Sequence, residues 1–181
     1  MKSFKLVLIG DGATGKTAVR EAFLGRGFSS SYLMTVGADF ALRAVEIGEE
    51  KVRMQIWDLA GQLTFKDVRA VYYKGAHGAM LVFDTTRSPT YENCINWVNE
   101  VYKTIDKHIP MIIVGNKIDI RNTNEPDHIS TEQGEKLAKK VSEMTNIPVK
   151  YIETSAKTNH NVQQAFKEIA QLLYEQIDLK S

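Results

Sequence analysis

The sequence has little cysteine, no long apolar run and no excess of either charge, and each scarcity excludes a class of protein. A single cysteine, Cys94, rules out an intrachain disulfide and a zinc or iron–sulfur site built from cysteines. Lys and Arg number 23 against 22 Asp and Glu, and this balance argues against a bulk electrostatic partner such as duplex nucleic acid. No apolar run approaches the roughly 18 residues that a membrane-spanning helix needs.

Targeting signals are missing as well. The apolar run 6–9 is too short for the core of a signal peptide, and no small-residue cleavage site follows it. Residues 177–181 hold neither a cysteine for prenylation nor a basic cluster for an anionic membrane. We therefore expect a cytoplasmic protein without a membrane anchor in this chain. Peripheral membrane association would then need a lipidated tail that is absent here, or a partner.

The order of apolar segments predicts the fold class. The 181 residues are 43% hydrophobic and 25% charged, which is ordinary for one globular domain, and we expect a single domain over 1–181. Strands are expected over 4–9, 38–47, 51–58, 79–84, 111–115 and 150–154, and helices over 16–24, 87–108 and 161–177. This alternation predicts an α/β fold, with a mostly parallel sheet, one antiparallel hairpin strand and helices on both faces.

The first strand runs into a glycine-rich segment, in which residues 10–17 read GDGATGKT. This fits the phosphate-binding pattern G-x-x-x-x-G-K-[ST] between a strand and a helix. The glycines let backbone amides wrap phosphates, Lys16 would reach the β- and γ-phosphates, and the Thr17 hydroxyl would bind Mg²⁺. The alternative is a glycine-rich turn with a chance Lys-Thr pair. The expected phosphate contacts are Gly12, Ala13, Thr14, Gly15, Lys16, Thr17 and Ala18.

Three further motifs follow predicted strands. Residues 58–62 read DLAGQ, where Asp58 can hold a water of a Mg²⁺ shell, the Gly61 amide can approach a γ-phosphate and Gln62 can orient an attacking water. By itself this pattern is also a common turn.

Residues 116–119 read NKID, and the Asp119 carboxylate can accept hydrogen bonds from N1–H and the 2-amine of guanine. Adenine lacks both donors and would leave a buried carboxylate unpaired. Residues 154–157 read TSAK, where the Ala156 amide could donate to the guanine O6. Alone, the first tetrad could be a polar strand exit and the second a turn of small residues. Four motifs in this order at one edge of a sheet are the stronger signal.

With these motifs the sequence resembles the Ras superfamily of small GTPases over about its whole length. The segments TVGADF (35–40), QIWD (55–58), YYKGA (72–76) and LVFDTT (81–86) are most similar to the Rab branch, whereas the phosphate loop with Ala13 is more similar to the Rho branch. The resemblance implies a P-loop NTPase G domain that binds GTP or GDP, with Mg²⁺ as cofactor.

The resemblance also assigns roles in the two switch segments, 28–40 and 63–74. Phe28 would pack edge-on against guanine, Tyr32 would cover the phosphates, and Thr35 would bind both Mg²⁺ and the γ-phosphate. The implied catalytic residues are Gln62, Lys16, Thr35 and Gly61, and the implied metal ligands are Thr17, Thr35 and Asp58. The implied base-binding residues are Asn116, Lys117, Asp119, Ser155, Ala156 and Lys157.

This reading implies a monomeric switch that hydrolyses GTP slowly and binds effector proteins through its switch segments. An exchange factor would reload it, and an activating protein would supply an arginine, because the resemblance supports none in cis. Departures from the family pattern are Thr14, Leu59 and the pair Leu63-Thr64, and the last of these puts the response to exchange factors in doubt. Two other functions stay open: a nucleotide-bound interaction module with negligible turnover, and an ATP-dependent P-loop enzyme, which conflicts with the NKID motif.

Overall fold

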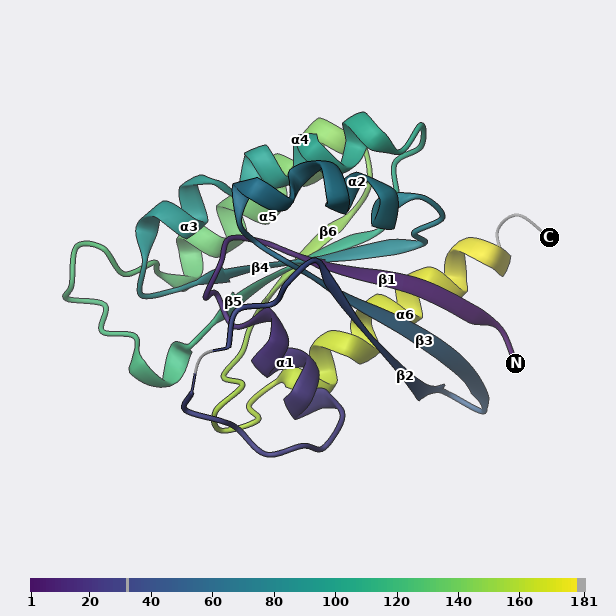
Figure 1. Ribbon diagram of the computed structural model, residues 1–181, viewed down its shortest axis with the longest axis horizontal. Helices are drawn as coiled ribbons and strands as arrows, with labels where there is room; N and C mark the ends of the chain where they lie inside the picture. Colours follow the sequence, from purple (N-terminus) through teal and green to yellow (C-terminus); the bar gives the residue numbers. More distant parts are fainter. Residues whose placement is uncertain (32, 179–181) are drawn as a thin grey trace.

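A six-stranded sheet forms the centre of the computed structural model, which describes residues 1–31 and 33–178 (Figure 1). Its strands are β1 (Ser3–Ile9), β2 (Ala38–Ile47), β3 (Glu50–Leu59), β4 (Gly78–Asp84), β5 (Met111–Asn116) and β6 (Val149–Glu153). They lie in the order β2-β3-β1-β4-β5-β6, and β2 runs antiparallel to β3 while the other neighbouring pairs are parallel. The predicted α/β fold with one antiparallel strand is confirmed.

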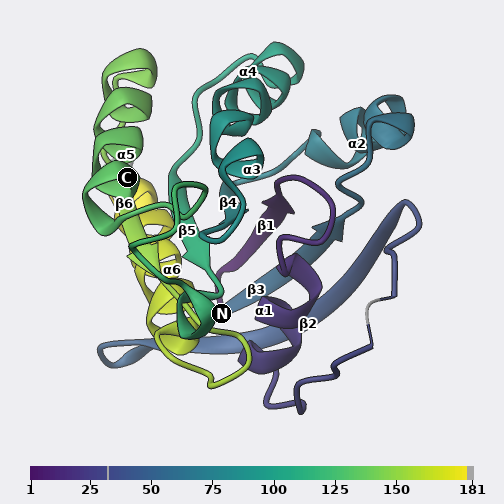
Figure 2. The same cartoon turned by 90° about the vertical axis from the view of Figure 1, so that its left-hand side faces the viewer.

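Helices cover both faces of this sheet (Figures 1 and 2). On one face lie α1 (Lys16–Phe23) and α6 (Val162–Asp178), and on the other lie α2 (Lys66–Tyr73), α3 (Ser88–Glu92), α4 (Cys94–Thr104) and α5 (Thr131–Thr145). Alternate residues of each central strand enter opposite cores: on β1, Leu6 and Leu8 pack on the α1/α6 side and Val7 and Ile9 on the other. Burial on both faces explains why these strands are almost continuously apolar.

The helices differ from the sequence prediction in two places. The helix predicted over 87–108 is interrupted at Asn93, whose side-chain amide donates to Asp11 Oδ1 at 2.6 Å, and it ends at Thr104. Neither α2 nor α5 was among the helices predicted from the sequence. The signal for α5 was present, because Ser130 and Gln133 form a capping box in which each side chain binds the other's backbone N–H, at 3.2 and 2.8 Å.

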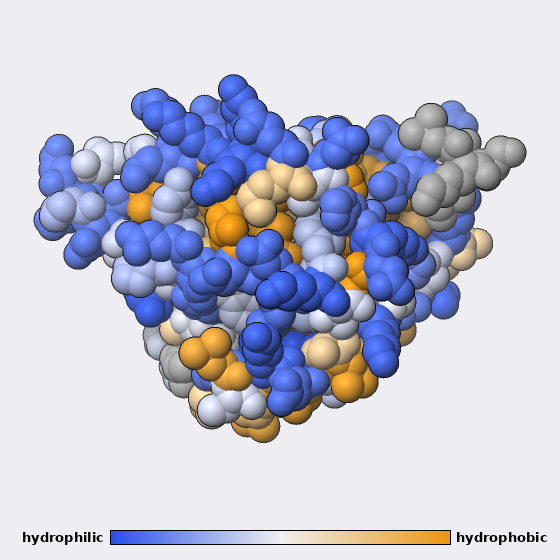
Figure 3. Space-filling model, turned by 90° about the horizontal axis from the view of Figure 1, so that it is seen from above, coloured by the Kyte–Doolittle hydropathy of each residue, from blue (hydrophilic) through white to orange (hydrophobic). Residues whose placement is uncertain are grey.

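Within the described ranges, no helix combines the length and the apolar character that crossing a bilayer requires. The face covered by α2, α4 and α5 is mostly hydrophilic, with apolar side chains in separate patches (Figure 3). The connecting loops meet at the carboxyl ends of the parallel strands, which is where open α/β sheets bind their ligands.

Tyr151 on β6 fills a space that two glycines leave open. A Cβ at Gly115 on β5 or at Gly134 on α5 would overlap the Tyr151 ring, which stacks on Phe83 with centroids 6.0 Å apart. The ring hydroxyl donates to Glu153 Oε1 at 3.1 Å, so the ring is held in place. The glycines are therefore needed for packing and not for backbone freedom.

Gly134→Ala should destabilise the protein although alanine is the better helix former. We expect the free energy of unfolding to fall by about 1–3 kcal/mol, because overpacking outweighs the ~1 kcal/mol gain in helix propensity. Urea unfolding measures the change. The control is Gly27→Ala, because a Cβ there meets nothing within 4 Å, and it should change stability by no more than about 0.5 kcal/mol. A Gly134→Ala protein more stable than the wild type would contradict this packing.

Candidate functional site

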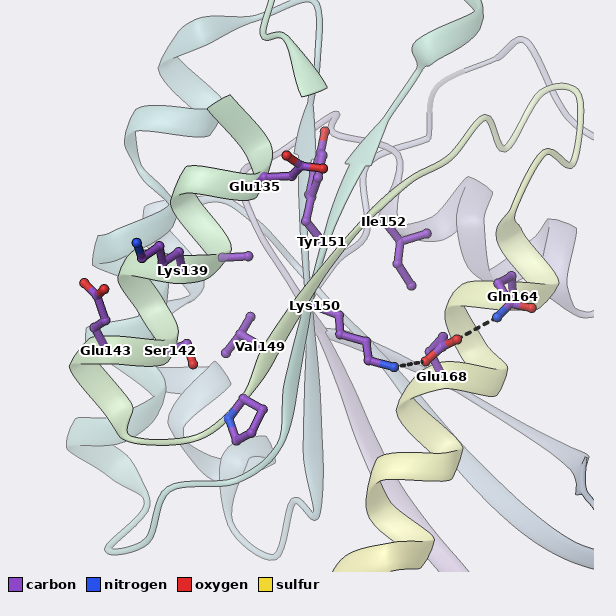
Figure 4. Close-up of a pocket in the computed structure, with 12 residues that line it drawn as sticks. Glu135, Lys139, Ser142, Glu143, Val149, Lys150, Tyr151, Ile152, Gln164 and Glu168 are labelled. Carbon is purple, nitrogen blue, oxygen red and sulfur yellow. Dashed lines mark hydrogen bonds and ion pairs between the residues drawn. The ribbon is translucent and has the colours of Figure 1, made fainter. Parts of the chain in front are cut away.

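A hollow of about 370 Å³ lies where the loops after β1 and β3 meet the segment before β2. It is lined by many of the residues singled out from the sequence: Gly12, Ala13, Gly15, Lys16, Thr17, Ala18, Phe28, Thr35, Gly61, Gln62 and Lys117. A larger hollow of about 620 Å³ lies beside the open edge of β6, between α5 and α6 (Figure 4). It holds none of the predicted site residues, so the smaller hollow is the candidate site.

The phosphate-loop segment curls around the Lys16 side chain. Lys16 is 6% exposed, and its ammonium donates to the carbonyl oxygens of Gly10 at 2.8 Å and Asp11 at 2.7 Å. Burial lowers the pKa of Lys16 to about 8, although the charges of Asp58 and Asp11 pull it upward. A phosphate would supply further negative charge in the hollow that this ammonium lines, so the segment is suited to an anionic ligand.

Asn116 joins three loops through one buried side chain. Its Nδ2 donates to the Thr14 carbonyl at 3.0 Å, while its Oδ1 accepts from the Thr154 hydroxyl at 3.0 Å and from the Ala156 amide at 3.2 Å. Gly15 has φ of +98°, and a Cβ there would overlap the Asn116 amide. None of the predicted residues Thr14, Asn116 and Ala156 lines the hollow. They instead join, in the protein interior, the loops that surround it.

The acidic residue of the NKID motif lies against the TSAK loop. Ser155 donates from Oγ to Asp119 Oδ1 at 2.6 Å, and the Asp119 side chain is otherwise exposed. Lys117 crosses toward the phosphate loop, where its ammonium donates to the Ala13 carbonyl at 2.8 Å and pairs with Asp84 at 2.7 Å. Lys157 follows in the exposed part of the TSAK loop. Loops from three strands thus present polar groups in one place.

The three predicted metal ligands also come together. Thr17 donates a short hydrogen bond from its hydroxyl to Asp58 Oδ2, and the hydroxyl oxygens of Thr17 and Thr35 are 3.0 Å apart. Burial raises the pKa of Asp58, whereas the Thr17 hydrogen bond and the charges of Lys16 and Arg20 lower it. Asp58 Oδ1 is buried and has no hydrogen-bond partner among the described residues. Oxygen donors of this kind suit Mg²⁺, and the unmatched carboxylate oxygen fits a water of its shell.

Gly61 packs directly on the phosphate loop. A Cβ at Gly61 would lie 2.5 Å from backbone atoms of Gly10, Asp11 and Gly12, so no other residue fits here without moving the loop. The Gly61 backbone therefore lies against the phosphate-binding segment with no room for a side chain between them. This contact would let the Gly61 amide reach the end of a bound phosphate chain.

Comparisons with known proteins decide what this site belongs to. Residues 5–175 match the model of the Ras family. The chain is 38% identical over 177 residues to Ras-related protein Rab-8A of Bos taurus and equally to that of Rattus norvegicus, covering 98% of this chain and 81% of each relative. It is 37% identical over 177 residues to Ras-related protein Rab-8B of Homo sapiens, again covering 98% of this chain and 81% of the relative. The chain belongs to the Ras family.

Within the family it is a small GTPase near the Rab branch, as the sequence resemblance predicted. The roles that the resemblance assigned to the switch residues stay predictions. Phe28 lines the hollow with half of its surface exposed. Tyr32 lies outside the described residues. Leu59, one of the departures from the family pattern, is fully buried and also borders the hollow.

In this Ras-family protein, a buried residue that was not predicted from the sequence holds the loop 58–62. Arg69 on α2 is fully buried, and its Nη1 donates to the carbonyls of Ala60 at 2.9 Å and Gln62 at 2.7 Å, on either side of Gly61. Its other nitrogens donate to both carboxylate oxygens of Glu100 on α4, at 2.7 and 2.9 Å. The guanidinium also lies over the Trp97 ring, 4.4 Å from its centroid.

Asp11 and Arg20 were missed as well. Asp11 Oδ1 accepts from the Trp97 indole at 2.7 Å, which ties the phosphate loop to α4. Arg20 lies beside Asp58, with 3.9 Å between Nη1 and Oδ2. The sequence signal was an arginine on the otherwise apolar inner face of the helix 16–24, but its partners are far away along the chain.

Glu100 should make the free energy of unfolding depend on pH in the acidic range. Burial by itself would raise the pKa of Glu100, but the hydrogen bonds from Arg69 and Tyr73 and the Arg69 charge hold that pKa below its ordinary value. The stabilisation is present above the unfolded-state pKa of about 4.3 and is lost as the pH falls through the lower folded-state value. Urea unfolding between pH 6 and pH 3 should show a shallower loss of stability in Glu100→Gln than in the wild type. The exposed Glu135→Gln serves as control, and parallel curves for wild type and Glu100→Gln would contradict the prediction.

Proposed function

We propose that this protein is a molecular switch that binds GTP and GDP with Mg²⁺ and hydrolyses GTP slowly. The observation that carries the proposal is the meeting of Lys16, Thr17, Thr35, Gly61 and Gln62 around one hollow. The Lys16 ammonium and the loop amides would bind phosphate oxygens. Thr17, Thr35 and Asp58 would hold Mg²⁺, which when bound offsets the negative charge of the phosphates.

Guanine is the base that the polar loops are suited to bind. The Asp119 carboxylate would accept from N1–H and the 2-amine, and Phe28 would pack on the ring edge. The Ala156 amide, which donates to Asn116 Oδ1 at 3.2 Å, would share its hydrogen with the guanine O6. The hydrogen bond from Ser155 at 2.6 Å orients Asp119 for this task and leaves its second oxygen available to the base. Charge-assisted bonds of this kind are the strong ones, so they would dominate the choice of base.

Asp119→Ala should weaken GDP binding by about a hundredfold or more, because two charge-assisted hydrogen bonds of about 1.5–3 kcal/mol each would be lost. Titration with a fluorescent GDP analogue measures the change, and competition with ADP measures base selectivity. Asp127→Ala is the matched control, because Asp127 is an exposed aspartate of the following loop. A loss of less than tenfold, or equal competition by ADP and GDP in the wild type, would refute guanine recognition by Asp119.

Hydrolysis would proceed by attack of a water oxygen on the γ-phosphorus while the bond to the β–γ bridging oxygen breaks, giving GDP and inorganic phosphate. Gln62 would orient the water, and the backbone amide of Gly61 would donate to the γ-phosphate. The role of the chain is therefore positioning and electrostatic stabilisation. Arg69 supports that role because it holds the carbonyls on both sides of Gly61.

Turnover is expected to be slow without a partner. Arg87 reaches the Gly12 carbonyl at 3.4 Å, but its side chain is exposed and the hydrogen bond is long. We propose that an activating protein supplies a better-placed arginine, which is worth roughly 10³ to 10⁵ in rate.

Gln62→Leu should slow single-turnover hydrolysis on the order of a hundredfold while GTP affinity stays within about threefold, because water orientation is lost and phosphate binding is not. The protein is loaded with GTP and Mg²⁺, and GDP formation is followed by chromatography. Gln55→Leu is the control, because Gln55 on β3 donates to the Ser3 hydroxyl on β1 and does not line the hollow. Equal rates in wild type and Gln62→Leu would refute the role of Gln62. GTP retained in both would favour the nucleotide-bound interaction module.

The switch segments also support a partner surface. Leu33 and Leu63 are each 81% exposed, and Val36 and Val71 are exposed as well. We propose that effectors bind segments 28–40 and 63–74 when the γ-phosphate holds Thr35 and Gly61, and release them after hydrolysis. An exchange factor would then restore GTP. The similarity to Rab proteins supports a role in membrane traffic or signalling, through this surface.

A further inference from the structure

Arg20 places a permanent positive charge inside the wall of the proposed Mg²⁺ site. It lies on α1 one turn after Thr17 and is 4% exposed. Its Nη2 donates to Asp39 Oδ2 at 2.6 Å and to Glu21 Oε1 at 2.9 Å. Its Nη1 is buried, has no hydrogen-bond partner within the described part of the chain, and lies 3.9 Å from Asp58 Oδ2. One donor of the guanidinium is therefore left for Asp58.

The carboxylates around Arg20 do not fully neutralise the positive charge of its guanidinium. Asp39 and Asp58 face each other as direct partners in the β2–β3 register, so Arg20 bridges two like charges. The Asp39 side chain is 61% exposed, and Glu21 also pairs with Arg26 at 3.0 Å. Solvent therefore screens Asp39, and Arg26 also pairs with Glu21, whereas Asp58 is fully buried. The attraction between Arg20 and Asp58 is the least screened of the three.

We propose that Arg20 competes with Mg²⁺ for the negative charge of Asp58 and thereby sets a low Mg²⁺ affinity of the nucleotide complex. The inference rests on the proposed function, because it assigns Asp58 to the Mg²⁺ shell. An arginine stays protonated at neutral pH, and hydrogen bonds to Asp39 and Glu21 hold the Arg20 side chain beside Asp58. Nucleotide retention would consequently depend on the Mg²⁺ concentration, with Arg20 fixing where that dependence falls.

The test measures the dissociation rate of a fluorescent GDP analogue from the full chain across a MgCl₂ series. We expect Arg20→Leu to lower the Mg²⁺ concentration at half effect by on the order of tenfold, because a repulsive charge is removed. Arg20→Gln, which keeps a donor for Asp39, should act in the same direction and covers the case in which the leucine variant does not fold. Arg26→Leu is the matched control: it removes an arginine from the same Glu21, but one whose side chain is 65% exposed, and it should leave the midpoint within twofold.

A double variant separates charge from structure. Arg20→Leu with Asp39→Asn restores the net charge of the cluster, so the midpoint should return to within about threefold of the wild type. A double variant that stays at the value of Arg20→Leu would mean that Arg20 acts by holding β2, and it would overturn the proposal. So would a midpoint that is unchanged or raised in both single variants. Failure of the wild type to bind the GDP analogue at all would instead contradict the proposed function.

Discussion

The buried amide of Asn116 is the interaction on which the base and phosphate ends of the site both depend. A primary amide offers two donors and one accepting oxygen, and here it spans the Thr14 carbonyl, the Thr154 hydroxyl and the Ala156 amide. These groups belong to loops that follow β1 and β6, while Asn116 itself ends β5. A buried polar group without a hydrogen-bond partner costs about 1–3 kcal/mol, so each of the three loops depends on the others for its hydrogen-bond partners. Their mutual placement is thus fixed before any ligand arrives.

At the opposite end of the site, neighbouring segments hold one another in place through direct contacts. Gly61 touches the phosphate loop, and Arg69 grips the carbonyls beside it from a buried position on α2. Glu100 holds Arg69 in turn, so the position of the loop 58–62 depends on the packing of α2 against α4. On the other side, among the described residues, the Thr35 hydroxyl contacts the Thr17 hydroxyl at 3.0 Å and no hydrogen bond to a buried cation is found. A γ-phosphate would thus act on two segments of unequal rigidity, with the Thr35 side the easier to move.

Local patterns in the sequence were enough to predict the sheet and the loops, because each motif directly follows an apolar strand. The carboxyl ends of parallel strands share one edge, so GDGATGKT, DLAGQ, NKID and TSAK had to meet there. The capping box of Ser130 and Gln133 was equally local, but it was not used, and α5 was missed. The contacts of Arg69 and Arg20 could not be predicted in this way. Glu100 lies 31 residues from Arg69, and nothing in either segment indicates that α2 and α4 are neighbours.

The same distinction explains why the charge around Asp58 only becomes visible in three dimensions. Arg20 follows Thr17 by three residues, which places both on one side of α1, but the register of β2 with β3 brings Asp39 opposite Asp58. Two carboxylates facing each other on one sheet need a cation between them when no metal is bound, and the guanidinium meets that need. At the Mg²⁺ site that we propose, a bound metal would make the same guanidinium a like charge beside it. The stability of the sheet at this point and tight Mg²⁺ binding would then be opposing demands on one arginine, which Asp39 and Glu21 hold in place.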